Sequence, residues 1–200
     1  MNIRRSAHFL AACLLGFSAS VFAAADGSQL PLPEGAEVAI VVFEDLQCPD
    51  CARVHPELLK ATEASKAPLV IRDFPITRHA WAFPAAVLAR YFSSRSPGLG
   101  AEFRSYIFEN QRDINTGNLR QYGEKFAEAH QLQLPPDVDP DGTLKAQVQA
   151  DFDLGVQIKL EYVPLIFVIG PGQGAEHFVE VKDVAMLGET IAQMRQKSPD

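Results

Sequence analysis

The hydrophobic positions of the chain fall into short unbroken runs and longer mixed stretches. Residues 38–43 form a continuous apolar, β-branched run, which is typical of a strand buried on both faces. Residues 69–72 and 165–169 show shorter runs of the same kind. After the turn sequence Pro-Gly-Gln-Gly, residues 177–181 complete the set. We therefore expect these four segments to be strands.

The remaining stretches have the composition of helices. Pro49 suits the first turn of a helix that follows the first strand and continues to residue 64. Residues 80–160 are rich in Ala, Leu, Phe, Gln and Glu and are interrupted by Gly and Pro turns, which predicts three or four helices. Asp183 can cap a last helix. The order of elements predicts a single α/β domain with a helical insertion at about residues 80–160.

The first 25 residues have the pattern of an export signal. A basic start is followed by the mostly apolar residues 9–22 and by small residues at the expected cleavage site. We therefore expect a signal peptide at 1–25, an extended lead-in at 26–37 and the folded domain at 38–197. A lipid anchor at Cys13 is the alternative, but the apolar stretch before Cys13 is shorter than a signal requires.

Charge and hydropathy exclude two classes of protein. The chain has 18 Lys and Arg against 25 Asp and Glu, and loss of the two signal arginines leaves a net charge of 16 − 25 = −9. Binding to nucleic acid needs a basic face, so we expect no nucleic-acid partner. The apolar run at 9–22 is too short for a transmembrane helix and no later run is as long, which excludes a multi-pass membrane protein.

The cysteines carry the clearest chemical signal. Cys13 is lost with the signal, which leaves Cys48 and Cys51 in an exported, oxidising setting. Residues three apart on a helix are close enough to close a disulfide and to open it again without refolding. Cys48 would lie at the helix N-terminus, where unpaired N–H groups favour the thiolate, so we predict that it is the nucleophile. Cys51, one turn further on, would be the shielded resolving thiol.

The cysteine pair has two other interpretations. A purely structural disulfide over so few residues would restrict the unfolded chain little and contribute little stability. A metal site could use Cys48, Cys51 and His55, which fall on one helical face. Structural zinc needs four ligands, whereas copper(I) needs fewer and remains an alternative. Haem attachment is excluded because Ala52 follows the second cysteine.

The segment Phe43–Cys51 (FEDLQCPDC) resembles the active-site approach of DsbA-like thioredoxin-fold thiol–disulfide oxidoreductases. Residues 72–80, residues 103–111 and the pair Val163-Pro164 resemble further segments of that family, and the resemblance covers about 38–194. It implies a thioredoxin fold with an inserted helical block between an N-terminal βαβ-like part and a C-terminal ββα part. It also implies that Pro164 is cis and packs beside Cys48, with the Val163 backbone pairing with an extended substrate segment.

The sequence departs from the family pattern at two places. Val42 stands six residues before Cys48, where family members often have a buried carboxylate that relays a proton. Glu44, Asp45 or water are the alternatives for that role. Asp45 matches an acidic position common in the family, and its other interpretation is a solvated loop carboxylate that helps to cap the helix.

The two residues between the cysteines, Pro49 and Asp50, are expected to tune the pair. Asp50 replaces the histidine of the most oxidising members, and a carboxylate close to Cys48 would oppose formation of its thiolate. A milder oxidant is the result expected from that charge. The alternative is that Asp50 points into solvent, where its charge is screened.

The function expected from the sequence is that of an exported, periplasmic enzyme without a cofactor. It would oxidise the thiols of client proteins through a mixed disulfide at Cys48 that Cys51 resolves. A quinone-linked membrane partner, of the DsbB or the vitamin K epoxide reductase type, would then reoxidise the pair. The alternatives are a disulfide reductase or isomerase kept reduced by a membrane donor, and a copper-binding or copper-delivery protein that uses the two cysteines.

Overall fold

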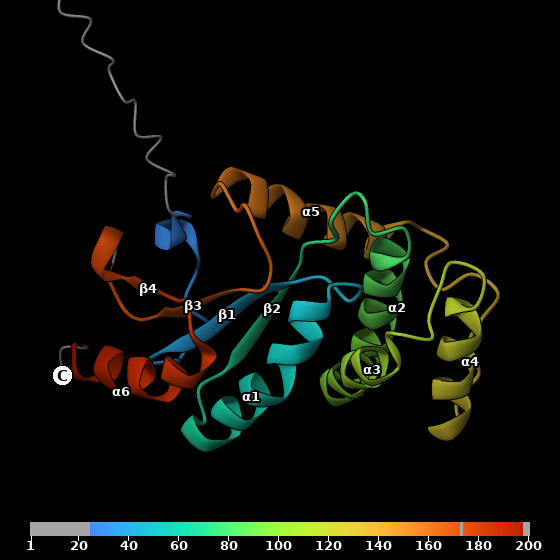
Figure 1. Ribbon diagram of the computed structural model, residues 1–200, viewed down its shortest axis with the longest axis horizontal. Coiled ribbons are helices and arrows are strands. Elements are labelled where there is room, and N and C mark those ends of the chain that lie inside the picture. Colours follow the sequence, from blue (N-terminus) through green and yellow to red (C-terminus); the bar gives the residue numbers. More distant parts are fainter. Residues whose placement is uncertain (1–24, 173, 198–200) are drawn as a thin grey trace, which may run out of the picture.

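The computed structural model describes residues 25–172 and 174–197, so the expected signal peptide lies outside the described residues except for Ala25. Within them the strands form one sheet in the order β2-β1-β3-β4 (Figure 1). β1 pairs parallel with β2 and antiparallel with β3, which pairs antiparallel with β4. Their bounds are β1 Ala39–Glu44, β2 Leu69–Asp73, β3 Leu165–Ile169 and β4 Phe178–Val181. These strands confirm the four segments expected from the hydrophobic runs.

The central strand β1 is buried on both faces, as its unbroken apolar run predicts. All six of its residues are buried. Because strand side chains alternate between faces, Val41 and Phe43 join the core under the helical insertion. Ile40 and Val42 face the opposite core, which is closed by α1 (Pro49–Ser65) and α6 (Leu187–Lys197). Figure 1 shows these two helices side by side along one face of the sheet.

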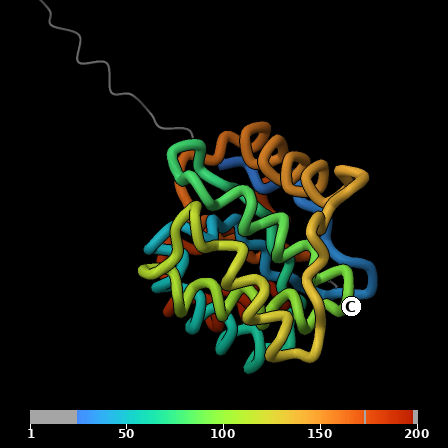
Figure 2. Tube along the Cα trace, turned by 90° about the vertical axis from the view of Figure 1, so that its right-hand side faces the viewer, coloured from blue at the N-terminus to red at the C-terminus, as the bar shows by residue number. Residues whose placement is uncertain are grey.

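The helical insertion lies between β2 and β3 and confirms the predicted block. Its helices are α2 Ala82–Arg95, α3 Pro97–Asn110, α4 Leu119–Ala129 and α5 Thr143–Gln157. Ser96 separates the first two helices, since its side chain accepts a hydrogen bond from the Leu99 N–H at 3.1 Å and caps α3. Aromatic rings then join three helices: Phe92 lies 4.6 Å from Phe103 and 4.9 Å from Phe126 between ring centroids. These helices lie toward one end of the molecule in Figure 1, and Figure 2 looks onto that end.

The lead-in is more structured than the extended segment expected from its prolines. It includes a 3-10 helix, η1 (Gly27–Gln29), capped by the Asp26 side chain. Leu30 follows with 1% exposure and belongs to the core. His177 lies with its Nε2 2.8 Å from the Leu30 carbonyl oxygen, so this segment is held beside β4. Residues 26–30 are therefore part of the folded domain.

The C-terminal elements follow the expected order with one extra turn. η2 (Gly174–Glu176) precedes β4, and η3 (Val184–Met186) precedes α6. Asp183 caps η3 through a hydrogen bond from the Ala185 N–H at 3.0 Å, so it does not cap α6 directly as the sequence suggested. In the described part of the chain, the helices are too short or too polar to span a membrane.

Candidate active site

The two cysteines lie where the central strand turns into the first long helix. Cys48 is the N-cap residue of α1 in extended conformation, and Pro49 occupies the first helical turn, where its missing N–H costs no hydrogen bond. Cys51 lies in that same turn. Both cysteines are buried free thiols, with 7% and 2% exposure. The unpaired N–H groups of the helix start therefore surround the first of two adjacent thiols.

Cys48 is the more acidic thiol. Its pKa is lowered to about 6, chiefly because the Cys51 thiol donates a hydrogen bond to its thiolate, and also because the N–H groups of Cys51 and Asp50 donate to it. Burial and the nearby charge of Asp45 oppose this shift. The N–H groups at the start of the helix therefore lower the pKa of Cys48, as the sequence predicted, but the neighbouring Cys51 thiol lowers it more.

The pKa of Cys51 shifts in the opposite direction. Burial raises the pKa of the Cys51 thiol, and its hydrogen bond to Cys48 raises it further. The Asp45 N–H donates to the Cys51 sulfur at 3.5 Å, which offsets part of that rise. The pair therefore consists of one thiol that ionises readily and one that stays protonated.

The segment before β3 brings a backbone carbonyl against the first cysteine. The Val163-Pro164 peptide bond is cis. The Cys48 thiol donates to the Val163 carbonyl oxygen over 3.7 Å, although the two residues are 115 positions apart. The structure thus brings Cys48 and Cys51 together with Val163, and the cis bond joins Pro164 to that residue.

A cleft of about 420 Å³ opens beside Cys48. Its walls are mainly apolar and aromatic, with charged residues among them: they include Phe74, Ile76, Arg78, Phe152, Glu161, Tyr162 and Val163. The Phe74 and Phe152 rings stack with centroids 4.8 Å apart, which joins the end of β2 to the insertion helix α5. Cys48 lines the cleft and Cys51 does not. Only the acidic thiol of the pair therefore borders this cavity.

Asp50 also lines this cleft, but its side chain is exposed and already has a partner. Its side chain is 66% exposed, and its carboxylate pairs with Arg53 at 3.0 Å. An exposed, paired charge is screened by solvent and by its partner. The geometry agrees with the alternative in which Asp50 affects Cys48 little through its carboxylate.

Asp45 is buried, so the interpretation of a solvated loop carboxylate is wrong. Its side chain has 0% exposure and accepts hydrogen bonds from the Gln47 N–H at 2.6 Å and the Ile76 N–H at 2.7 Å. His79 Nδ1 lies 2.8 Å from the same carboxylate. No role was predicted for His79 from the sequence, whereas the structure places it against the loop that carries the cysteines.

Glu44 belongs to a buried network of charges that sequence reasoning missed. Arg104 from α3 contacts the Glu44 carboxylate at 2.9 Å and Asp73 at 2.7 Å. Arg90 from α2 contacts Asp73 at 2.5 Å and also pairs with Asp151 of α5. Burial raises the pKa of Glu44, while the Arg104 charge opposes the rise. The network thereby fixes the ends of β1 and β2 to three insertion helices.

His55 is turned away from the cysteines. Its Nε2 lies 2.9 Å from the Ser105 hydroxyl, and its ring packs on Phe108 with centroids 4.8 Å apart. Burial and the Arg104 charge lower the pKa of His55 to about 4. Over residues 25–172 and 174–197, no three His, Cys, Asp or Glu side chains come together in an arrangement that could hold a metal ion. The three-ligand site considered from the sequence is not formed.

Comparison with known proteins agrees with this geometry. A sequence profile for the family described as Thioredoxin matches residues 33–179. The chain belongs to this thioredoxin family. No curated protein sequence matches it.

Solved structures show which variant of the thioredoxin fold the chain adopts. α-DsbA1 of Wolbachia pipientis superimposes with a TM-score of 0.67 at 17% identity, over 85% of this chain and 95% of that one. NmDsbA1 of Neisseria meningitidis gives a TM-score of 0.59 at 17% identity, over 84% and 87% of the two chains. At such identities the likeness concerns the fold, and it confirms the thioredoxin fold with an inserted helical block.

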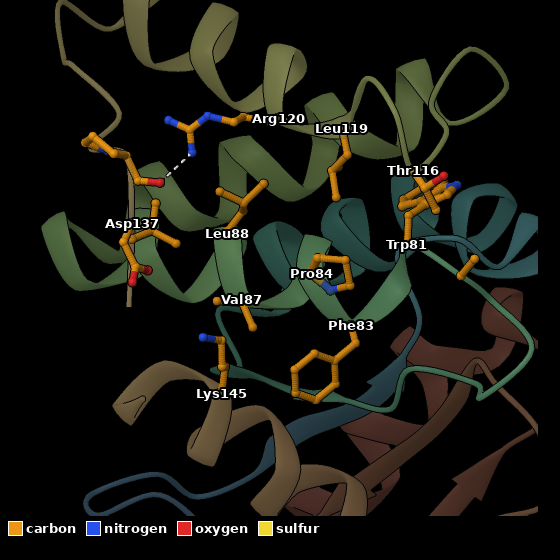
Figure 3. A pocket seen from close by; sticks show the side chains of 13 residues that line it. Trp81, Phe83, Pro84, Val87, Leu88, Thr116, Leu119, Arg120, Asp137 and Lys145 are labelled. Atoms are coloured by element: carbon orange, nitrogen blue, oxygen red, sulfur yellow. Dashed lines mark hydrogen bonds between the residues drawn. The ribbon is translucent and has the colours of Figure 1, made fainter. Parts of the chain in front are cut away.

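A second cavity, of about 440 Å³, lies within the insertion of this thioredoxin-family protein (Figure 3). Its apolar walls include Trp81, Phe83, Val87, Leu88 and Leu119, with Arg120 and Lys145 also lining it. Neither cysteine lines it. The chemistry of the pair is therefore assigned to the cleft beside Cys48.

Proposed function

We propose that this thioredoxin-family protein is an exported thiol–disulfide oxidoreductase that oxidises the thiols of client proteins. The observation that carries the proposal is the opposite acidity of two adjacent cysteines, of which only the acidic one borders a cleft. One structural neighbour, α-DsbA2 of Wolbachia pipientis, is described as a thiol-disulfide exchange protein and matches with a TM-score of 0.64 at 16% identity, over 80% of this chain and 83% of that one.

The reaction starts from the Cys48–Cys51 disulfide. A client thiolate in the cleft attacks the Cys48 sulfur, a mixed disulfide forms, and Cys51 leaves as a thiolate that takes up a proton. A second client thiolate then attacks the client sulfur of the mixed disulfide and releases Cys48 as a thiolate. Two electrons pass from the client to the cysteine pair, and the client gains one disulfide. In the reverse direction Cys51 attacks the mixed disulfide and resolves it.

The acidity of Cys48 supports oxidation as the favoured direction. A pKa of about 6, against the 9.0 of an ordinary cysteine thiol, stabilises the reduced pair at pH 7 by about 1.4 kcal/mol at most. For a two-electron couple this corresponds to roughly 30 mV toward a stronger oxidant. A cysteine pair that prefers to be reduced transfers its disulfide readily. It then needs reoxidation, for which we propose a quinone-linked membrane partner of the DsbB or vitamin K epoxide reductase type.

The backbone beside the pair supplies a place for an extended client segment. We propose that the backbone of Val163, held against Cys48, pairs with the client chain next to its cysteine, while apolar client side chains enter the cleft. Backbone pairing is independent of side-chain identity. Such a site would accept many clients.

The test is transfer of the disulfide to a reduced, unfolded protein that contains cysteines. The oxidised protein should form disulfides in this client, and Cys48→Ala should abolish the transfer. Cys51→Ala, mixed instead with a disulfide-bonded client, should accumulate mixed disulfides, because its Cys48 thiolate attacks the client disulfide and no second cysteine resolves the product. Reduction potentials measured against glutathione separate oxidase from reductase, because a value at or below the roughly −270 mV of thioredoxin would contradict the oxidising direction. One equivalent of copper in anaerobically purified protein would support the copper-delivery alternative instead.

Export has its own test. Protein recovered from the periplasm of a bacterial host should lack the expected signal peptide, and its N-terminal sequence should begin near residue 26. Recovery only in the cytoplasm, with residues 1–25 retained, would contradict the proposed location.

A further inference from the structure

A side chain of the helical insertion holds the loop that carries Cys48. Gln111 follows the last residue of α3, and its side-chain Nε2 donates to the Leu46 carbonyl oxygen at 2.9 Å. The same nitrogen donates to the Cys48 carbonyl oxygen at 3.1 Å. Leu46 and Cys48 are 2% and 7% exposed. One side chain therefore donates to the carbonyls of two buried residues that are separated by a single residue.

The chemistry of these contacts fixes what the side chain must be. Both partners are carbonyl oxygens and accept hydrogen bonds only, so the NH₂ group of an amide satisfies both, with one hydrogen for each. A carboxylate of the same shape would place an oxygen against two oxygens. A thioether of similar length would remove the Gln111 donor from the buried Leu46 carbonyl, which is costly, and would leave the Cys48 carbonyl with the Ala52 N–H as its donor.

The other side of the loop is also held from the segment that leads into the insertion. The Trp81 N–H donates to Gln47 Oε1 at 2.8 Å, and the Ile76 N–H donates to the Asp45 carboxylate at 2.7 Å. Gln111 lies on a different element from these two residues. The Cys48 backbone also bonds locally, since its N–H donates to the Asp45 carbonyl oxygen at 3.0 Å and its carbonyl oxygen accepts from the Ala52 N–H at 3.1 Å. Gln111 adds a contact to this backbone from a distant element.

We propose that Gln111 is a positioning residue for thiol–disulfide exchange, because it holds the Cys48 backbone so that the sulfur stays within reach of its hydrogen-bond donors. This inference rests on the proposed function. The donors are the Cys51 thiol and the N–H groups of Asp50 and Cys51, whose alignment with the sulfur depends on the direction in which the Cys48 backbone enters α1. Freeing the loop misaligns these donors and makes the thiolate of Cys48 less stable.

The test compares Gln111→Met with Gln121→Met. Methionine keeps the length of glutamine but carries no donor and no charge, and Gln121 is an exposed position on α4 that serves as the matched control. Iodoacetamide alkylation of Cys48 is followed by peptide mass mapping from pH 4 to 9 in the reduced, folded protein. We expect the inflection of Gln111→Met to rise from about 6 to about 7, which lowers the alkylation rate at pH 6 about fivefold. Gln121→Met should keep the wild-type profile.

The pH profile of Cys48 alkylation distinguishes a residue that positions Cys48 from one that only stabilises the fold. A residue that only stabilises the fold would shift the urea midpoint of Gln111→Met and leave the alkylation inflection of the folded protein in place, and this result would overturn the inference. Should Gln111→Met not fold, Gln111→Asn, which keeps the amide on a shorter arm, should show the same upward shift, and a wild-type profile would again overturn it. Failure of the wild-type protein to oxidise a dithiol client would instead contradict the proposed function, since alkylation needs no client.

Discussion

Replacing Cys51 by alanine tests what makes Cys48 acidic. The structure assigns the largest contribution to the hydrogen bond from the Cys51 thiol and smaller ones to the N–H groups of Cys51 and Asp50. Cys51→Ala removes the thiol donor and leaves both N–H groups in place. We therefore expect the pKa of Cys48 to rise, although the start of α1 is unchanged.

The size of the shift follows from the energy of a hydrogen bond to a charged group. Such a bond contributes about 1.5–3 kcal/mol, and one pKa unit corresponds to about 1.36 kcal/mol. Loss of the Cys51 donor should thus raise the pKa of Cys48 by about 1–2 units, from about 6 to about 7–8. At pH 6 the thiolate fraction would fall from about half to less than about one tenth.

The assay is the pH dependence of Cys48 alkylation in the reduced protein, read from the mass of the Cys48 peptide. Cys51→Ser is the matched control, since its hydroxyl donates a hydrogen bond from the same position and should keep the inflection close to that of the wild type. An inflection near pH 6 in Cys51→Ala would refute the reasoning, because the N–H groups of the helix start would then suffice. Equal upward shifts in both variants would show that a hydroxyl cannot replace the thiol as donor.

Three further predictions concern buried and exposed charges. Arg104→Ala should lower the free energy of unfolding by about 3–5 kcal/mol in urea, because Glu44 and Asp73 lose their buried partner, and a change below about 1 kcal/mol would contradict this. The free energy of unfolding of the wild type should fall by up to about 3 kcal/mol as the pH is lowered from 6.5 to 4, because in this range His55 takes up a proton only in the unfolded state. Urea unfolding of His55→Leu should lack this part of the pH dependence. Asp50→His should lower the pKa of Cys48 by less than about one unit and raise the reduction potential correspondingly little, because the native carboxylate is exposed and paired. A larger rise of the potential in a redox titration would show that this position is coupled more strongly to Cys48.

The buried charges explain how the insertion can influence the cysteine pair. Glu44 and Asp45 end the central strand and begin the active-site loop, and both find partners on the segment between β2 and β3. A buried carboxylate without a partner would be costly, so the insertion must pack in one arrangement to satisfy both. The helical block is therefore coupled to the geometry of Cys48 by polar contacts as well as by its apolar core.

The sequence by itself determined the elements and the reactive pair. The apolar run at residues 38–43 predicted the central strand because a strand covered on both faces needs apolar side chains on each. The three-residue spacing of Cys48 and Cys51 at the start of a helix predicted two adjacent sulfurs, because helix geometry is local. Resemblance to a known family supplied Val163 and Pro164, which no local pattern would have singled out.

Tertiary structure alone decided which distant side chains meet at the site. Asp45 read equally well as a solvated carboxylate, and only the packing of residues 76–79 against the loop buries it. His55 has the spacing of a metal ligand, yet α3 takes its ring toward Ser105. The contact of Gln111 with the Cys48 loop joins residues 63 positions apart. Hydrophobic periodicity and residue spacing predict the local backbone structure over a few helical turns. Contacts between distant residues depend instead on how whole helices and strands pack, which a local sequence pattern does not predict.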